Sequence, residues 1–101
     1  MRITFFKYKD GKEKKVIVLS SNKNTIFGID LSTFNEVKYA SIIKKHLSFI
    51  SKYKDDLNDA GDELNYVLEG LGMWKAYKQH IGLDDKYYQE FDRKNITYHR
   101  N

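Results

Sequence analysis

Histidines are the side chains best suited to acid–base chemistry or metal binding, and the chain has three, His46, His80 and His99. No two of them are four residues apart, and cysteine is absent, so no metal-ligand spacing is present. A small metal-free ribonuclease needs only a few basic and hydroxyl side chains around a phosphate. The candidates for that chemistry are Tyr98, His99 and Arg100 with Lys78 and His80. Nothing in the sequence brings these residues together, so an enzyme ranks third and no catalytic residue is predicted.

An acidic stretch from Asp56 to Asp62 resembles the start of a calcium-binding EF-hand loop. It has the acid, amide and glycine of that motif, but Ala60 and Val67 stand where two oxygen ligands are required. The acids are better explained by the start of a helix, with Asp59 or Asp62 as its N-cap. The sequence therefore predicts neither a metal site nor a bound cofactor.

Lysines gather near the N-terminus, with Phe6 and Tyr8 among them. Cations with interleaved aromatic rings are typical of surfaces that follow a phosphate backbone. Arginine, the main carrier of base-specific contacts, occurs only three times in the chain. The alternative function is therefore nonspecific, salt-dependent nucleic-acid binding through Lys7, Lys9, Lys12, Lys14, Lys15 and Lys23.

Protein binding is the function that the sequence favours. Tyrosine-rich surfaces supply large, stiff contact areas, and interfaces are enriched in them. Acidic and aromatic residues alternate in the last third of the chain, where they can form a face that fits a cationic active site. The predicted protein-binding residues are Tyr77, Asp84, Asp85, Tyr87, Tyr88, Glu90 and Phe91. Replacing Asp85, Tyr87 and Tyr88 is expected to weaken binding without unfolding the protein.

The whole profile resembles toxin-immunity proteins and phage or mobile-element anti-defence inhibitors. It is a short, tyrosine-rich chain without a catalytic signature, in which Lys, Asn, Ile and Tyr, the residues of AT-rich codons, supply 39 of 101 residues. The resemblance implies a non-enzymatic bacterial or phage protein that inhibits a toxin or a host-defence enzyme by stoichiometric binding. It covers no specific motif and assigns no residue.

The first 31 residues predict β-structure. Asp10-Gly11 favours a two-residue type I′ hairpin turn. That turn places Phe5 opposite Val16, and it sets Lys7 against Lys14, an unfavourable pair of like charges. A third strand is expected at 25–31, where Gly28 indicates a bulge or a close backbone approach.

Residues 33–95 predict helices. Thr33 and Glu36 form a capping box before a helix from about 34 to 54. It carries two apolar stripes, one through Val37, Ala40, Ile43, Leu47 and Ile50, the other through Tyr39, Ile42, His46, Phe49 and Tyr53. So wide an arc indicates a central helix or an interface, and it leaves monomer and homodimer open; exposed Phe49 and Tyr53 would favour the dimer.

A second helix is expected at 62–81, with Gly82 as its left-handed C-cap. Gly70 and Gly72 either allow close packing of this helix or break it near Leu71. A short helix at 85–93 with Asp84 as N-cap and a last strand at 96–98 complete the order. Strands and helices do not alternate, so the fold class is α+β: a hairpin-led antiparallel sheet of three strands, packed against two to three helices.

Length and charge limit the remaining possibilities. A chain of 101 residues can bury one hydrophobic core, so a single domain over 1–101 is expected. Residues 1–54 carry twelve Lys and Arg against four Asp and Glu, whereas 55–101 carry six against ten. No apolar run is long enough to cross a membrane and the N-terminus is not a signal peptide, so we expect a cytoplasmic protein.

Overall fold

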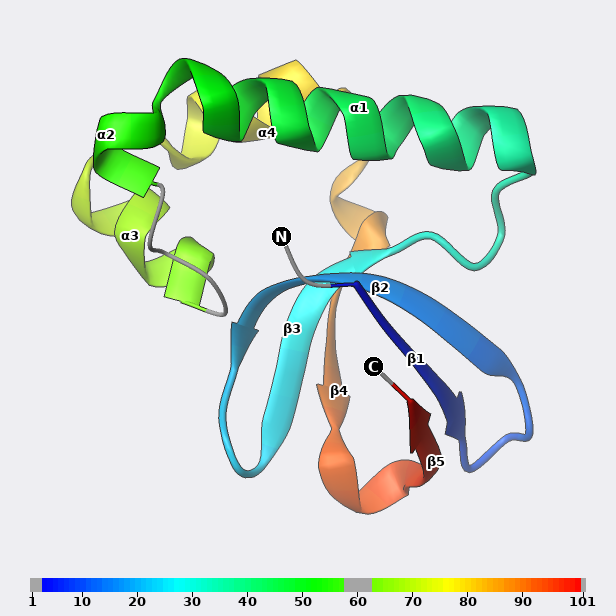
Figure 1. Cartoon of the computed structure of the whole chain (residues 1–101). Coiled ribbons are helices and arrows are strands. Elements are labelled where there is room, and N and C mark those ends of the chain that lie inside the picture. The colour runs from blue at the N-terminus through cyan, green and yellow to red at the C-terminus, as the bar shows by residue number, and fades with distance from the viewer. Residues whose placement is uncertain (1–2, 58–62, 101) are drawn as a thin grey trace.

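The computed structural model describes residues 3–57 and 63–100 and has the predicted α+β class (Figure 1). A five-stranded antiparallel sheet of order β4-β3-β2-β1-β5 packs beneath a layer of helices. The strands are β1 Ile3–Tyr8, β2 Glu13–Ser21, β3 Thr25–Asp30, β4 Tyr88–Asp92 and β5 Ile96–Arg100. The helices are α1 Glu36–Lys52, α2 Lys54–Leu57, α3 Leu64–Gly70 and α4 Trp74–Ile81.

The predicted hairpin between β1 and β2 forms, but its register differs by one residue. Tyr8 N–H donates to Lys12 O and Gly11 N–H donates to Tyr8 O, so the loop has three residues, and Gly11 adopts a φ of 81°. A three-residue loop with a left-handed glycine is the next most common hairpin connection after the two-residue turn. Lys7 consequently lies opposite Glu13, and the predicted Lys7–Lys14 repulsion is absent.

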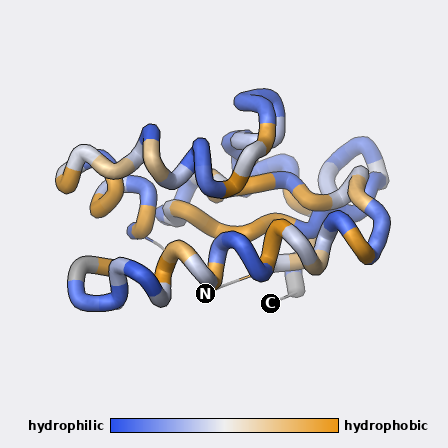
Figure 2. Tube along the Cα trace, turned by 90° about the horizontal axis from the view of Figure 1, so that it is seen from above, coloured by the Kyte–Doolittle hydropathy of each residue, from blue (hydrophilic) through white to orange (hydrophobic). Residues whose placement is uncertain are grey.

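Both faces of the sheet are buried, and β2 contributes to both through Val16, Ile17, Val18 and Leu19. One face meets the helices, and its core consists of Ile17, Leu19, Ile29, Leu31, Ile42, Phe49, Leu57, Leu64, Leu68, Tyr77 and Ile81. Figure 2 views the helical layer from above, where hydrophobic and hydrophilic stretches alternate along the helices. The period-2 pattern expected of a half-exposed strand is therefore replaced by a continuous apolar run in β2.

The second core lies on the other face, inside a curl of the sheet. β4 and β5 are consecutive in the chain but occupy opposite edges, joined by the 3₁₀ turn Arg93–Asn95. The sheet must bend to bring these edges together, and the ring centroids of Phe6 on β1 and Phe91 on β4 lie 5.1 Å apart. This inner cluster consists of Phe6, Val16, Val18, Ile26 and Phe91.

Gly28 allows β3 to approach β2 closely, as predicted. A Cβ built at Gly28 would lie 2.0 Å from the carbonyl oxygen of Ile17 and 2.6 Å from Val16 Cγ1. The ladder is irregular between Val18 and Ser20, next to the Val18–Gly28 pair. The predicted bulge and the close approach thus occur together, which increases the bend of the sheet.

α1 starts later than predicted and buries the middle of the second of its two apolar stripes. Its N-cap is Asn35, whose Oδ1 accepts from Lys38 N at 2.9 Å, so the predicted Thr33–Glu36 capping box is wrong. The helix buries Ile42, His46 and Phe49, which belong to the second stripe. Members of the first stripe face solvent, with Val37 81% and Leu47 45% exposed.

The predicted helix over 62–81 is divided. α3 ends at Gly70 and α4 begins at Trp74, with Gly72 between them at a φ of 67°, so the expected break near Leu71 is present. Gly82 is the left-handed C-cap that the sequence predicts, with a φ of 73°. The candidate caps Asp59 and Asp62 lie outside the described residues.

The helix predicted at 85–93 is wrong. Asp85–Tyr87 forms one 3₁₀ turn, preceded by Asp84 without a side-chain cap bond, and the chain then continues as β4. β4 pairs with β3, with Ile26 opposite Phe91 and Ile29 opposite Tyr88. The unpaired edge of β3 supplies hydrogen bonds that the local helical pattern cannot reveal. The last predicted strand is confirmed and extends to Arg100.

Candidate functional site

Two of the residues predicted to bind a protein lie in the core. Tyr77 is 0% and Phe91 3% exposed, so neither reaches a surface where a partner could contact it. Tyr77 Oη forms a 2.7 Å hydrogen bond with His46 Nδ1, and Phe91 belongs to the inner cluster. For these two residues the predicted surface role is wrong, because large aromatic rings fill a small core as readily as an interface.

The other aromatic residues of this segment pack against the protein itself. The ring of Tyr87 lies 4.9 Å from that of Phe34, and Tyr88 packs edge-on against Trp74 at 5.7 Å. The Tyr88 hydroxyl is buried without a hydrogen-bond partner among the described residues, and burial raises the pKa of Tyr88 to about 12. Exposed positions are left to Asp84, Asp85 and Glu90. The exposed side chains of this segment are therefore polar, because Lys86 and Gln89 are exposed beside these carboxylates.

The lysines of the predicted nucleic-acid surface separate into several places. Lys9 lies in the β1–β2 turn, and Lys23 lies in the β2–β3 turn at the opposite end of β2. Lys7 lies on β1, opposite Glu13 of β2. Lys15 leaves β2 on the helical side, with its Nζ 5.5 Å from the centroid of the Tyr39 ring. The six lysines do not form one continuous patch.

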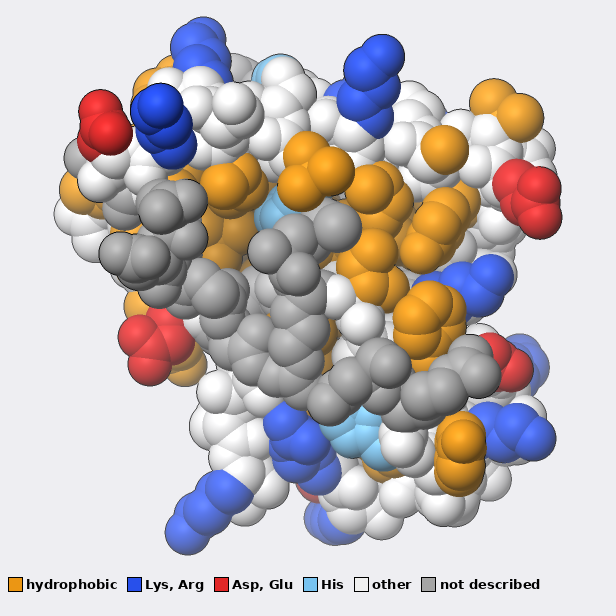
Figure 3. Space-filling model, viewed as in Figure 1, with side chains coloured by type: hydrophobic (Ala, Val, Ile, Leu, Met, Phe, Trp, Pro, Cys, Tyr) orange, Lys and Arg blue, Asp and Glu red, His pale blue; other side chains and the backbone are white. Residues whose placement is uncertain are grey.

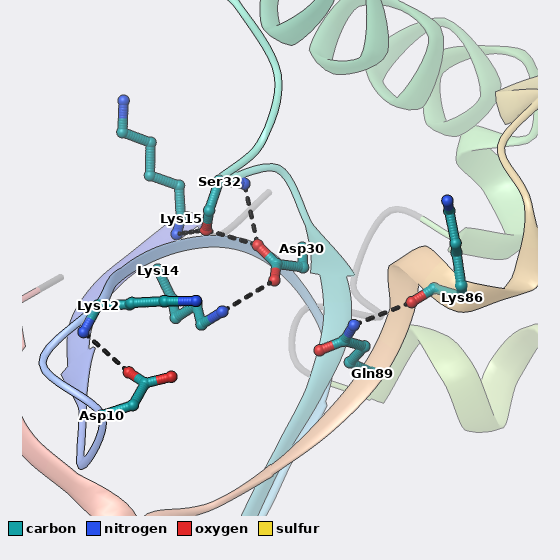
Figure 4. Close-up of polar contacts among 8 residues, drawn as sticks. All are labelled: Asp10, Lys12, Lys14, Lys15, Asp30, Ser32, Lys86 and Gln89. Atoms are coloured by element: carbon teal, nitrogen blue, oxygen red, sulfur yellow. Dashed lines mark hydrogen bonds and ion pairs between the residues drawn. The ribbon is translucent and has the colours of Figure 1, made fainter.

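Lys14 lies beside a polar hollow that is lined by Asp30, Thr33, Lys86, Tyr87 and Gln89, and Figure 4 shows its contact with Asp30. Asp30 is 6% exposed, and its Oδ1 accepts from both N and Oγ of Ser32. Its Oδ2 lies 3.6 Å from Lys14 Nζ, so Lys14 is already paired. Figure 4 shows Lys12 on the same side of the hairpin as Lys14, and Lys86 is one of the residues that line the hollow. The surplus positive charge here is that of Lys12 and Lys86.

An apolar surface that the residue predictions missed runs along α1. A shallow groove is lined by Tyr39, Ala40, Ile43, Lys44, Leu47, Ser48 and Ser51, and we call it the α1 groove. Figure 3 shows hydrophobic side chains gathered along α1 and below it toward the sheet. The wide apolar arc in the sequence was the signal for this face. Phe49 is only 3% exposed, so the condition set for a homodimer is not met at that residue.

The histidines lie in three different surroundings. His46 is buried beside Tyr77, and burial lowers the pKa of His46 to about 4. His80 is exposed on α4, with its ring 5.6 Å from that of Phe49. His99 lies on β5, where its Nε2 is 2.5 Å from Thr4 Oγ1.

The residues of the ribonuclease hypothesis belong to two separate elements. Tyr98, His99 and Arg100 are on β5 at the edge of the sheet, whereas Lys78 and His80 are on α4, which packs against α1. Lys78 pairs with Asp85 at 2.7 Å and lies over the rings of Trp74 and Tyr88. The fold thus places the candidate residues on two separate elements.

Acidification should destabilise the protein through His46. Its pKa in the fold is about 4, below the ordinary 6.5, so the unfolded chain binds a proton that the folded protein excludes. The contribution of neutral His46 to the free energy of unfolding is complete above about pH 6.5. It is lost as the pH falls toward 4, and the total loss is about 3 kcal/mol. Urea unfolding followed by Trp74 fluorescence at several pH values measures this slope.

The variants His46→Gln and His80→Gln form a matched pair for this measurement. The first removes the buried titrating group and keeps a side chain that can hydrogen-bond to Tyr77, so the slope between pH 6.5 and 4 should flatten. The second is the control, because it makes the same substitution at an exposed histidine. An unchanged slope in His46→Gln would show that another group causes the acid sensitivity.

Among residues 3–57 and 63–100, no three His, Asp or Glu side chains gather in a way that could hold a metal ion. Most of the EF-hand-like stretch, residues 58–62, lies outside that part. No helix in the described part is long and apolar enough to cross a membrane. Comparison with protein-family models, curated proteins and solved structures finds no match to this chain.

Proposed function

We propose that this protein is a non-enzymatic binding protein that inhibits a protein partner by stoichiometric binding, as toxin-immunity and phage or mobile-element anti-defence proteins do. The observation that carries the proposal is the α1 groove, an apolar strip that borders the core-facing side of the helix, where Tyr39 and Ile43 are half-buried against the core and Leu47 is 45% exposed. Contiguous exposed apolar surface with polar residues at its rim is a feature of protein interaction sites.

The groove has the composition of a protein interface. Tyr39, Ile43 and Leu47 follow one another at intervals of four residues, so they form one ridge along the helix. Tyrosine and leucine side chains in a row bury a large area against a partner helix or strand, at about 25 cal/mol per Å². The contact surface proposed is therefore α1, in place of the acidic segment from which Tyr77 and Phe91 are withdrawn into the core.

A pair of variants on α1 tests the proposal. Leu47→Asp places a charge in the groove, whereas Val37→Asp places one on the same helix at a more exposed position outside it. Both side chains reach solvent, so both variants should fold. We expect tagged wild-type protein and Val37→Asp to recover one stoichiometric partner from a lysate of the encoding organism, and Leu47→Asp to recover at least about tenfold less.

Equal recovery by both variants would exclude the α1 groove as the contact. Circular dichroism and thermal unfolding of the two variants show that any loss of binding does not come from loss of the fold.

Nucleic-acid binding is the second candidate, supported by Lys12 and Lys86 beside the polar hollow. The same purification tests it through the ratio of absorbance at 260 and 280 nm. Nucleic acid that co-purifies, dissociates as salt is raised, and is lost in Lys12→Gln with Lys86→Gln would assign the function to this hollow. Lys23→Gln, at the other end of β2, is the control substitution.

A further inference from the structure

In the part of the chain that the structure describes, the charged side chains at the α1 groove are lysines. Lys44 lines the groove, and no carboxylate among the described residues does. Lys15 stands at its edge over the Tyr39 ring, and its backbone N–H donates to Ser32 Oγ at 2.9 Å, which fixes β2 at this point. The whole of α1 contains four lysines and one acid, Glu36, which lies before the groove begins.

A second copy of this chain does not suit the groove. Two α1 helices packed through their grooves would place Lys44 and Lys15 of both copies at one interface. Like charges brought together and desolvated oppose association by several kcal/mol. No acidic side chain of α1 is positioned within the groove to offset them.

The shape and length of the groove suit a helix. Its lining runs from Tyr39 to Ser51, so it extends about 18 Å along α1 at 1.5 Å per residue. Twelve residues of a partner helix cover that distance. Ala40, Ser48 and Ser51 are small, which allows a second helix axis to come close, while Ile43 and Leu47 provide the apolar contact.

We infer that the partner presents an acidic amphipathic helix to the α1 groove. This inference rests on the proposed function. The partner's apolar side chains cover Ile43 and Leu47, and its carboxylates pair with Lys44 and with Lys15. The cation–π contact with Tyr39 holds the Lys15 ammonium at the edge of the groove before the partner arrives.

Two synthetic peptides test the inference. Both are fluorescein-labelled 16-residue amphipathic helices with leucine at i, i+3, i+4 and i+7; four positions beside the leucines carry glutamate in one peptide and lysine in the other, and alanine or glutamine fills the rest. Fluorescence anisotropy should show that the wild-type protein binds the glutamate peptide at least about tenfold more tightly than the lysine peptide. Lys44→Glu should weaken binding of the glutamate peptide about tenfold. The double variant Lys15→Glu with Lys44→Glu should reverse the preference.

Lys52→Glu is the matched control, because it makes the same charge change on the same helix at a residue outside the groove lining. This variant should keep the preference for the glutamate peptide. Equal affinity for both peptides, or binding of neither, would overturn the inference. Concentration-dependent dimerisation that Leu47→Asp abolishes would overturn it in favour of a second copy. The Leu47→Asp recovery experiment is independent of the peptides, so the proposed function can stand when the acidic helix fails.

Discussion

Replacing Gly28 with alanine should destabilise the protein by about 4 kcal/mol, a large part of the stability of a small domain. The added Cβ would lie 2.0 Å from the Ile17 carbonyl oxygen and 2.9 Å from the Ile17 carbonyl carbon, both backbone atoms of β2. A side-chain rotation cannot relieve such a clash, so β2 and β3 must separate next to the irregularity in their ladder. Denaturant unfolding followed by Trp74 fluorescence measures the loss.

Gly70→Ala is the matched control for Gly28→Ala. A Cβ at Gly70 meets no atom within 4 Å, and Gly70 ends α3, so alanine there should stabilise the protein by about 0.5–1 kcal/mol. If Gly28→Ala remains within about 1 kcal/mol of the wild type, the close approach of β2 and β3 is wrong.

Tyr77→Ala should lower the free energy of unfolding by about 4 kcal/mol, because it empties the centre of the helical core. The Tyr77 ring stacks on Trp74 with centroids 5.5 Å apart and meets Phe49 edge-on at 5.2 Å. Its hydroxyl is the hydrogen-bond partner of buried His46, so Tyr77→Phe should still lose about 1–2 kcal/mol. Thermal and urea unfolding measure both variants.

Tyr66 provides the comparison for Tyr77. It is 59% exposed on α3, so Tyr66→Ala should change stability by less than about 0.5 kcal/mol. A Tyr77→Ala protein that keeps wild-type stability but loses its partner would restore Tyr77 to the interface and contradict the packing described above.

The elements whose conformation depends on neighbouring residues could be predicted from the sequence. The elements whose conformation depends on residues far away in the chain could not. Asp10-Gly11 predicts a hairpin correctly, but two loop lengths can both place Gly11 in a left-handed conformation, and they differ in register by one residue. β4 is strand because β3 has a free edge, although the two strands are separated in the chain by all four helices. No property of residues 85–93 alone distinguishes that outcome from a helix.

The candidate site could be predicted in part. The apolar arc of α1 is wider than one core contact requires, so the sequence indicated that one of the two stripes faces away from the core. It did not indicate which stripe that is. The stripe with a histidine is the buried one, because Tyr77 supplies a hydrogen bond to His46 from another helix. The predicted surface role of Tyr77 and Phe91 was wrong for a similar reason. Whether these residues lie in the core or on the surface depends on α1 and β1, which pack against them.

The position of β5 has a consequence for how the chain folds. Phe5 pairs with Arg100 and Phe6 with His99, contacts between residues more than ninety positions apart. The β1–β2 and β2–β3 hairpins close short loops and can form early, whereas the β1–β5 and β3–β4 ladders must wait for much longer loops to close. During synthesis β1 gains its second neighbour only after residues 96–100 have left the ribosome. Until then Ile96 does not yet pack against the inner cluster, and β1 remains an open edge to which another nascent chain can pair.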